Sequence, residues 1–300
     1  MRDYIKLIYI NKKFMKPINK YISEGGFFKN VGGDLKKELQ ERLITWISSH
    51  CVNTTHKYLE KLLKLEDDGC IHFAISLYMI LEITITDQDD IPGSLRFADD
   101  VNVSLKFDGV SFNKMSEWTH IFPSVITRIS INNMNIKNWS WLDSINNIFT
   151  LSISDSSLPS NGFVGFHPTI TSELRMANCD IDNLNKFPKM DKSASSYIYK
   201  CNNLKDISGI ADRNKSFENI AIEQCWNITS IGDLSKLTLN ECLFDNALLI
   251  KMAMDGKGKL FKKVKEAFGV KGVDRAGMTI KEVKIFLMYL YPRANIVMYL

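Results

Sequence analysis

The chain has 300 residues, of which 45% are hydrophobic and 24% are charged, and its formal net charge at pH 7 is +4. These proportions are ordinary for a soluble globular protein. No run of eighteen uncharged apolar residues occurs, and Lys6 interrupts the only apolar run near the N-terminus. A membrane helix and a signal peptide are therefore not predicted. We expect a cytoplasmic protein that does not associate with a membrane.

The cysteine pattern favours a reducing compartment. The chain has six cysteines and none of them lies in a C-x-x-C pair: Cys51, Cys70, Cys179, Cys201, Cys225 and Cys242. Four of them fall within the repeat described below, where a free cysteine would act as a small buried hydrophobic residue. We expect neither a disulfide framework nor a metal site built on these thiols.

Residues 1–82 read as an N-terminal helical capping unit. Asp34 is a suitable N-cap for a helix whose apolar stripe is Leu35, Leu39, Leu43, Trp46 and Ile47. A second helix is predicted to start near Asn53 or Thr54, with an apolar stripe at Tyr58, Leu59, Leu62, Leu63 and Leu65. Residues 70–81 read as buried core. This unit would cover the first rung of the solenoid that follows, because an uncovered solenoid end exposes its core.

From Ile83 to Phe244 apolar residues recur every 22–24 residues, except for a shorter last interval of 17. The first inward strand positions are predicted at Ile83, Leu105, Ile129, Leu151, Leu174, Tyr197, Ile220 and Leu237. A second inward position follows two residues later, at Ile85, Phe107, Ile131, Ile153, Met176, Tyr199, Ile222 and Leu239. Corner positions five residues after the first are predicted at Gln88, Val110, Met134, Ser156, Cys179, Asn202, Cys225 and Cys242.

The segments LRMANCDI, YIYKCNNL and LTLNECLF carry this pattern best. The pattern resembles the leucine-rich-repeat family, whose repeats of 20–29 residues read L-x-x-L-x-L-x-x-N/C-x-L. The resemblance covers residues 83–244 and implies an α/β solenoid with parallel strands on a concave face. Val110, Met134 and Ser156 depart from the corner Asn or Cys, so the first half should be less regular.

Connectors between the strands should form the opposite side of the solenoid. Residues 114–122 predict a short helix that carries Met115. Trp139 and Trp141 lie in the third connector and allow two readings, a binding hot spot or ordinary connector packing. Packing is the preferred interpretation. We place the domains at residues 1–82, 83–245 and 246–300.

The period disappears after Phe244, and residues 246–300 read as a basic C-terminal helical unit. Helices are predicted at residues 246–254 and 260–268, and a capping box at Thr279–Glu282 starts a third. Residues 251–293 hold eleven Lys or Arg and four Asp or Glu, a balance of +7. Such a unit could bind nucleic acid, although these lysines could equally keep a capping unit soluble.

No motif for catalysis, a cofactor or a metal was found. The five histidines lack H-x-x-x-H and H-E-x-x-H spacing, and no Walker, G-x-S-x-G or kinase pattern occurs. We therefore predict no catalytic, cofactor-binding or metal-binding residues, and a protein that is not an enzyme. An enzyme site within residues 1–80 stays an alternative, and it would need polar residues clustered near His50, His56 or His72.

Strand residues that alternate with the inward ones should face the concave side and meet a partner. The candidate partner-binding residues are Lys106, Asp108, Arg128, Asn132, Glu173, Arg175, Lys200 and Glu223. Their mixed charge favours a protein partner, because a nucleic-acid surface should be mainly basic. The alternative is that they are simply solvated strand faces.

The leading hypothesis is therefore a non-enzymatic protein that binds another protein on the concave strand face. Nucleic-acid association through residues 251–293 is the first alternative. The chain also looks rich in Ile, Lys and Asn, a composition typical of an AT-rich genome such as that of a bacteriophage or a low-GC bacterium. A phage accessory protein that acts on a host factor, in the host cytoplasm, is thus a further alternative.

Overall fold

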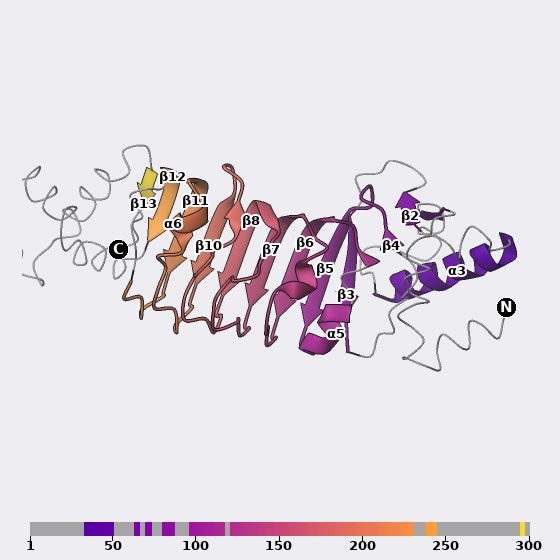
Figure 1. The fold of residues 1–300 in the computed structure, drawn as a ribbon, viewed down its shortest axis with the longest axis horizontal. Coiled ribbons are helices and arrows are strands. Elements are labelled where there is room, and N and C mark those ends of the chain that lie inside the picture. Colours follow the sequence, from indigo (N-terminus) through magenta and orange to yellow (C-terminus); the bar gives the residue numbers. More distant parts are fainter. Residues whose placement is uncertain are drawn as a thin grey trace, which may run out of the picture.

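A parallel sheet of stacked rungs dominates the computed structural model (Figure 1). The structure describes residues 33–50, 63–66, 70–73, 80–87, 96–117, 121–230, 238–244 and 295–297. The predicted second helix up to residue 62 and the predicted helices of residues 246–290 lie outside these ranges, and so do Gln88, His56 and the basic segment 251–293.

Helix α3 spans Gly33–His50, which confirms the helix predicted from Asp34 onward. Its buried side chains include Ile44 and Ile47, which are 2% and 0% exposed. The helix contacts β3 (Leu81–Ile85), the strand at the N-terminal edge of the large sheet. An apolar helix face over an edge strand shields the first rung from water, as expected for a cap.

A small sheet replaces the end of the predicted second helix. Strand β1 (Leu63–Leu65) pairs antiparallel with β2 (Cys70–Phe73), and β2 pairs parallel with β4 (Arg96–Phe97). Leu63 and Leu65 are buried and the residue between them is exposed, which is the period of a strand. The prediction that these leucines belong to a helical stripe was wrong, because a short L-x-L run fits either period.

The large sheet has ten strands, and every pairing within it is parallel. After β3 its members are β5 (Val103–Asp108), β6 (Val125–Asn132), β7 (Asn147–Ser154), β8 (Thr169–Ala177), β10 (Ser195–Tyr199), β11 (Ser216–Glu223), β12 (Thr238–Phe244) and β13 (Asn295–Val297). The short strand β9 (Lys189–Met190) pairs with β8 beside this path. Figure 1 shows the rungs side by side in chain order.

The first five rungs have the predicted inward register. Ile83, Leu105, Ile129, Leu151 and Leu174 pair in sequence along the sheet, and so do Ile85, Phe107, Ile131, Ile153 and Met176. All ten side chains are at most 3% exposed. Fully burying one such side chain contributes roughly 1.5–3 kcal/mol before entropy is counted, so these two columns form the central core.

The sixth rung differs from the prediction by one residue. Ser196 and Ile198, and not Tyr197 and Tyr199, pair with the inward residues Leu174 and Met176. Ser196 is fully buried, while Tyr199 is 36% exposed. A slip of one residue exchanges the two faces of a strand.

This slip also moves the corner of the sixth rung. Cys201, which is fully buried, takes the corner position assigned to Asn202, which is exposed.

The eighth rung is displaced further. Cys242 and Phe244 pair with Ile220 and Ile222, so they occupy the inward strand positions and not the corner. Leu239, predicted as an inward position, pairs with Phe217 near the strand start instead. With this register the interval between the last two rungs is close to the other intervals, and the apparent shortening of the last repeat disappears.

Six strands of the large sheet are each followed by a residue in the left-handed region of φ and ψ. These residues lie four positions after the first inward residue of their rungs, directly before the corner position, and have φ between 48° and 63°: Gly109, Asn133, Asp155, Asn178, Lys200 and Gln224. Gly, Asn and Asp tolerate this conformation best. In the first five of them the backbone N–H donates to a carbonyl of the next rung at 2.9–3.2 Å, so the ladder continues through the turn.

Connectors return each rung to the start of the next strand, and they lie in front of the strands in Figure 1. They include α5 (Phe112–Glu117), the 3-10 helix η3 (Ser140–Leu142) and α6 (Ile210–Arg213). Helix α5 overlaps the predicted helix of residues 114–122 but begins two residues earlier and ends at Glu117, and Met115 within it is fully buried. Trp139 and Trp141 are 1% and 3% exposed, which confirms connector packing and excludes a surface hot spot at these two residues.

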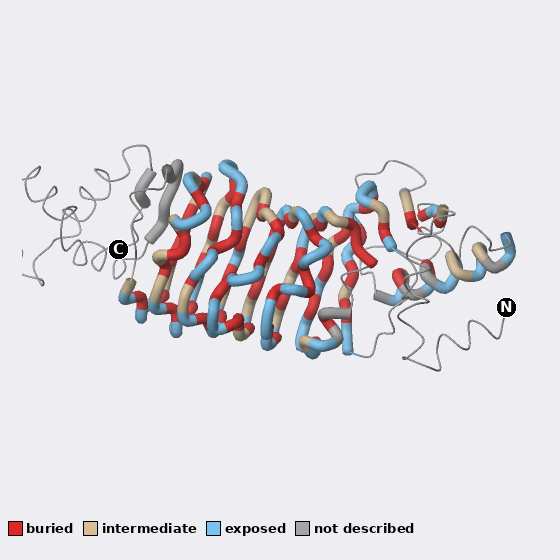
Figure 2. Tube along the Cα trace, in the orientation of Figure 1, coloured by how far each residue is buried: buried red, intermediate tan, exposed pale blue. Residues whose placement is uncertain are grey.

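The fold is therefore a β-solenoid with few helices, consistent with the predicted leucine-rich-repeat-like architecture. Figure 2 shows buried residues on the strands and along the connectors that face them. Helical units at both ends are not confirmed. The N-terminal region combines α3 with strands, and the described part of residues 246–300 is strand β13, which extends the sheet beyond β12.

Candidate interaction surface

One face of the large sheet carries the alternating residues that the connectors do not cover, and we call it the open face. Seven of the eight predicted partner-binding residues lie on it: Lys106, Asp108, Arg128, Asn132, Glu173, Arg175 and Glu223. Lys106, Asp108, Arg128 and Arg175 are exposed, and the other three are half-buried. The eighth, Lys200, was placed wrongly, because the one-residue slip puts it at the left-handed corner.

The middle of the open face is organised around Arg175. Its Nε donates to Glu173 Oε2 at 2.8 Å, and its guanidinium carbon lies 5.6 Å from the ring centre of Tyr197 on the next strand. The hydrogen bond to Glu173 raises the pKa of Arg175 above its usual value, although burial opposes the rise. The side chain is therefore held in place as a fixed cation over an aromatic ring.

A polar ladder runs along the strand ends of the open face. Asn132 Nδ2 donates to Asp108 Oδ1 at 2.7 Å, and Ser154 Oγ donates to Asn132 Oδ1 at 2.9 Å. Lys106 Nζ lies 3.5 Å from the second oxygen of Asp108. The predicted residues Asn132 and Asp108 are thus joined directly to each other, and Lys106 forms an ion pair with Asp108. Such a ladder fixes the side chains of three successive rungs in one orientation.

Two aromatic residues of the open face were assigned to the core from the sequence. Tyr197 is half-buried beside Arg175, and Tyr199 is exposed with Lys200 Nζ 5.0 Å from its ring centre. The signal that could have located them is the corner position. If Lys200 is the left-handed residue, counting back places Ser196 and Ile198 inside and both tyrosines outside.

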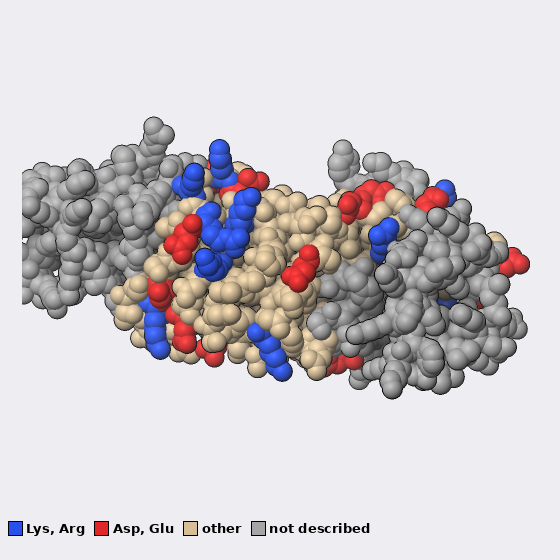
Figure 3. Space-filling model, viewed as in Figure 1, with Lys and Arg blue, Asp and Glu red and all other residues tan. Residues whose placement is uncertain are grey.

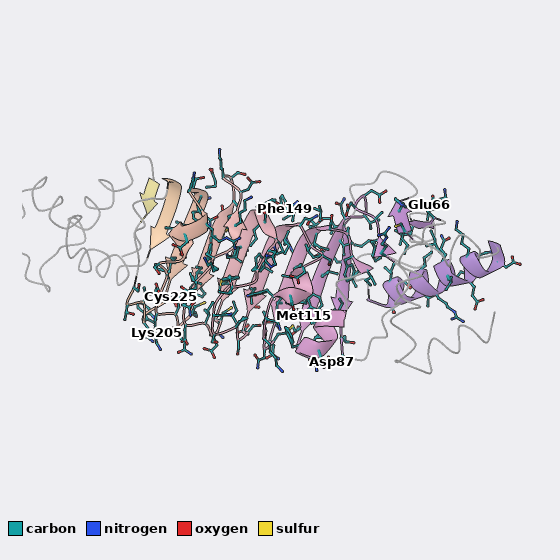
Figure 4. All side chains as sticks on the ribbon, in the orientation of Figure 1. Glu66, Asp87, Met115, Phe149, Lys205 and Cys225 are labelled. Atoms are coloured by element: carbon teal, nitrogen blue, oxygen red, sulfur yellow. The ribbon has the colours of Figure 1, made fainter. Side chains whose placement is uncertain are left out.

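Phe149 of β7 is a further exposed aromatic residue, at 53%. The pairing of β7 with β8 shifts register between Ile148 and Thr150, next to this residue. Figure 4 shows Phe149 near the end of the rungs where the strands begin. The extra residue lies in β8, where Ile170 to Glu173 spans three steps opposite two steps in β7, so Phe149 faces outward on the strand across from the bulge.

The described residues contain no group of three or more His, Cys, Asp or Glu side chains that could hold a metal ion. His72 Nδ1 lies 3.3 Å from Asp100 Oδ2, but both side chains are substantially exposed and the pair belongs to the small N-terminal region. Arg96 Nε donates to Cys70 Sγ at 2.8 Å in the same region. These contacts hold β2 and β4 together, which is a structural role.

Stacked cysteines form the corner column of the later rungs. The thiols of Cys179, Cys201 and Cys225 contact the carbonyl two residues earlier at 3.5, 3.6 and 3.4 Å. Ser156 Oγ makes the same contact in the preceding rung at 2.6 Å. The corner residues of these four rungs therefore contact the backbone at the strand end, and these thiols are core groups.

We expect Cys201 to resist alkylation in the folded protein. The pKa of Cys201 is raised to about 12. The hydrogen bond with the Cys179 thiol is the largest cause of this rise, burial adds to it, and the hydrogen bond with Cys225 opposes it. The thiolate is the reactive form, and at pH 8 its fraction should be about a thousandfold lower than in the unfolded chain. Iodoacetamide labelling with peptide mass spectrometry, with and without denaturant, measures this. Equal labelling of native and denatured protein would contradict it.

The same shift has a consequence for stability at alkaline pH. Because the folded-state pKa is raised, the contribution of Cys201 is fully present below the pKa of the unfolded thiol, near 9, and is lost as pH rises toward 12. The free energy of unfolding should therefore fall over this window more steeply than in a Cys201→Ser variant.

Comparison with protein-family models, curated proteins and solved structures finds no match for this chain. In the described part of the chain no helix is long and apolar enough to cross a membrane. The architecture defines the class of the protein as a β-solenoid, and any function has to be argued from its surfaces.

Proposed function

We propose that this chain is a non-enzymatic interaction protein that binds a protein partner on the open face of its solenoid. The leucine-rich-repeat resemblance supports this proposal through the shared layout of parallel strands with a surface of alternating side chains. The observation that carries it is the constellation of Arg175, Glu173 and Tyr197, in which a fixed cation and an aromatic ring stand at the centre of the face.

The chemistry of the face favours a protein over a nucleic acid. Its cations alternate with carboxylates, and both Lys106 and Arg175 already have an acidic neighbour on their own strand. A phosphate backbone would meet repulsion from these carboxylates. Arg and Tyr are enriched at the energetic centres of protein interfaces, where they combine large contact area with polar specificity.

A partner would dock through side chains and not by adding a strand. The backbone groups of the central strands already pair with both neighbouring rungs. Helix α3 contacts the strand at the N-terminal edge, which limits pairing there. Strand addition needs an uncovered sheet edge, so the face itself offers the accessible contact area.

Replacing the central pair should abolish partner capture. We expect the double variant Arg175→Glu with Tyr197→Ala to lose the partner recovered by the wild-type protein, with an affinity decrease of at least thirtyfold, about 2 kcal/mol. The measurement is quantitative proteomics of captured proteins, followed by calorimetric titration with the purified partner.

Lys137→Glu is the matched control, because Lys137 is exposed on a connector away from the open face. A partner that binds the double variant as tightly as the wild type would contradict the proposal. Equal loss in Lys137→Glu would also contradict it, because the effect would then follow net charge and not the face.

A further inference from the structure

The connector side of the later rungs carries a compact group of cations that the open face does not share. Figure 3 shows Lys and Arg side chains gathered over the region of β8, β10 and α6. Segments 186–192 and 212–218 lie on either side of β10, and their basic residues are Lys186, Lys189, Lys192, Arg213 and Lys215, which we call the connector cluster; all five are exposed. The acidic residues of the same stretches are Asp191, Asp212 and Glu218.

Hydrogen bonds between adjacent connectors place these cations together. Asn214 donates to Pro188 O and accepts from the Met190 backbone N–H, so Lys189 lies opposite the segment of Arg213 and Lys215. Gly209 lies directly against the backbone of Leu184 and Asn185, which brings the residues before α6 beside the turn that holds Lys186. The cluster therefore spans neighbouring rungs, and the rung spacing in a sheet is about 4.8 Å.

Arg213 shows how far the cluster reaches. Its Nη1 lies 3.5 Å from Phe166 O, two connectors away from its own. The guanidinium thus crosses the connector that carries Lys186 and Lys189. A carbonyl oxygen has no net charge, so this contact leaves the cation unneutralised.

The lysines of the cluster are also unneutralised within the described residues. Among the described residues, Lys64, Lys106 and Lys205 each form an ion pair with a nearby carboxylate. None of these ion pairs involves Lys186, Lys189, Lys192 or Lys215. The Asp191 carboxylate accepts a hydrogen bond from the Lys192 backbone N–H within its own turn and forms no ion pair with these lysines. Unpaired like charges on adjacent rungs repel one another, and an anionic ligand would remove that repulsion.

We propose that the connector cluster binds the phosphate backbone of a nucleic acid. The cations lie on two neighbouring connectors, about 4.8 Å apart, and Lys186, Lys189 and Lys192 are spread along one of them, which is too wide for one phosphate group and suits several successive phosphates. Lysine ammonium groups contact phosphates as point charges without a fixed geometry. The cluster has no exposed aromatic ring for base stacking, so binding should be independent of base sequence.

A membrane surface fits the cluster less well. Peripheral membrane binding combines cations with large apolar residues that enter the lipid. Among the exposed large hydrophobic residues of the described chain, Val164 and Trp226 lie on the connectors that adjoin the cluster. Trp226 follows the end of β11, whereas Lys215 precedes its start, so the two are separated by the length of the strand. One exposed valine is ordinary for a protein surface.

Fluorescence anisotropy with a labelled 20-nucleotide single strand and the matching duplex, at 50–200 mM salt, tests the proposal on the full-length protein. The cluster variant is Lys186→Glu with Lys189→Glu and Lys215→Glu. We expect it to weaken binding more than tenfold and to lower the slope of log affinity against log salt by about 2–3, which corresponds to three lost phosphate contacts.

Two further variants keep the test specific. Lys64→Glu with Lys137→Glu and Lys205→Glu makes the same charge change at exposed positions elsewhere. Lys257→Glu with Lys259→Glu and Lys262→Glu makes it in the basic C-terminal segment. Loss confined to the cluster variant, with an unchanged circular dichroism spectrum, supports the proposal.

Four results would overturn the proposal. The first two are an equal loss of affinity in the Lys64, Lys137 and Lys205 variant and a loss of affinity only in the C-terminal variant. The others are no binding of either nucleic acid by the wild type at 50 mM salt, and binding to anionic lipid vesicles or polyglutamate but to neither nucleic acid.

Discussion

Replacement of Trp139 by alanine is expected to lower the free energy of unfolding by about 3–5 kcal/mol, the range for a large aromatic residue removed from a core. Trp139 is 1% exposed and stacks on Phe163 with ring centres 5.2 Å apart, while Phe166 meets it edge-on at 5.3 Å. Its Nε1 donates to Gly162 O at 3.0 Å. Alanine would leave a cavity between connectors and an unpaired carbonyl.

Urea unfolding followed by far-ultraviolet circular dichroism measures this loss without relying on tryptophan fluorescence. Trp226→Ala is the matched control, because Trp226 is 59% exposed and its removal should change stability by no more than about 0.5 kcal/mol. Trp139→Phe should give an intermediate loss, since it keeps a ring and removes the hydrogen bond. Equal unfolding midpoints for the two alanine variants would contradict a core role for Trp139.

The aromatic residues of successive connectors explain why this site matters. Phe163 contacts Phe187 edge-on at 5.8 Å, and Phe187 contacts Phe217 at 6.3 Å. Three successive connectors and the start of β11 are thereby joined through one row of rings. In a solenoid each repeat is stabilised mainly by its neighbours, so a gap at Trp139 weakens the coupling between two rungs as well as the packing within one.

Much of the solenoid could be predicted from the sequence because its core positions are strongly apolar. Where the first five rungs repeat two aliphatic or aromatic residues two apart, from Ile83 to Met176, alternation and spacing agree and the register was correct. Helix α3 could be predicted because Asp34 begins a helical stripe of sufficient length. These are the cases in which burial alone decides the structure.

The predicted register was wrong in the rung where the buried residue is not an apolar one. In the sixth rung a fully buried serine, Ser196, occupies the position that hydrophobicity assigns to Tyr197. Serine is polar, so the hydrophobic pattern gave no reason to place Ser196 inside. Its Oγ has no hydrogen-bond partner in the described structure. The buried cysteines carry the missing information, because Cys179, Cys201 and Cys225 each lie five residues after the first inward residue of their rungs.

The two candidate surfaces also differ in whether they could be predicted from the sequence. Seven open-face residues were predicted because strand alternation fixes which side chains face outward. The connector cluster was not predicted, because Lys186 and Arg213 are 27 positions apart and only the stacking of connectors brings them together. The count of charges along the sequence pointed instead to residues 251–293, all of which lie outside the described residues.

Gly209→Ala is expected to destabilise the protein by about 1–3 kcal/mol or more, the cost of forcing extra volume into a packed region. A Cβ at Gly209 would lie 2.2 Å from Leu184 O and 2.9 Å from Asn185 Cα. Both are backbone atoms, so no side-chain rotation relieves the collision. The φ of Gly209 is −65°, which alanine adopts readily, so the effect would come from contact between connectors and not from backbone strain.

Gly33→Ala is the control for this substitution, because a Cβ there meets no atom within 4 Å and alanine favours the helix that begins at Gly33. It should be neutral or slightly stabilising in the same urea unfolding measurement. Because connectors hold both Lys189 and Arg213 in position, Gly209→Ala should also weaken nucleic-acid binding if the connector cluster is a binding site. Full stability of Gly209→Ala would show that the two connectors are further apart than the structure places them, and would remove the geometric basis of the cluster.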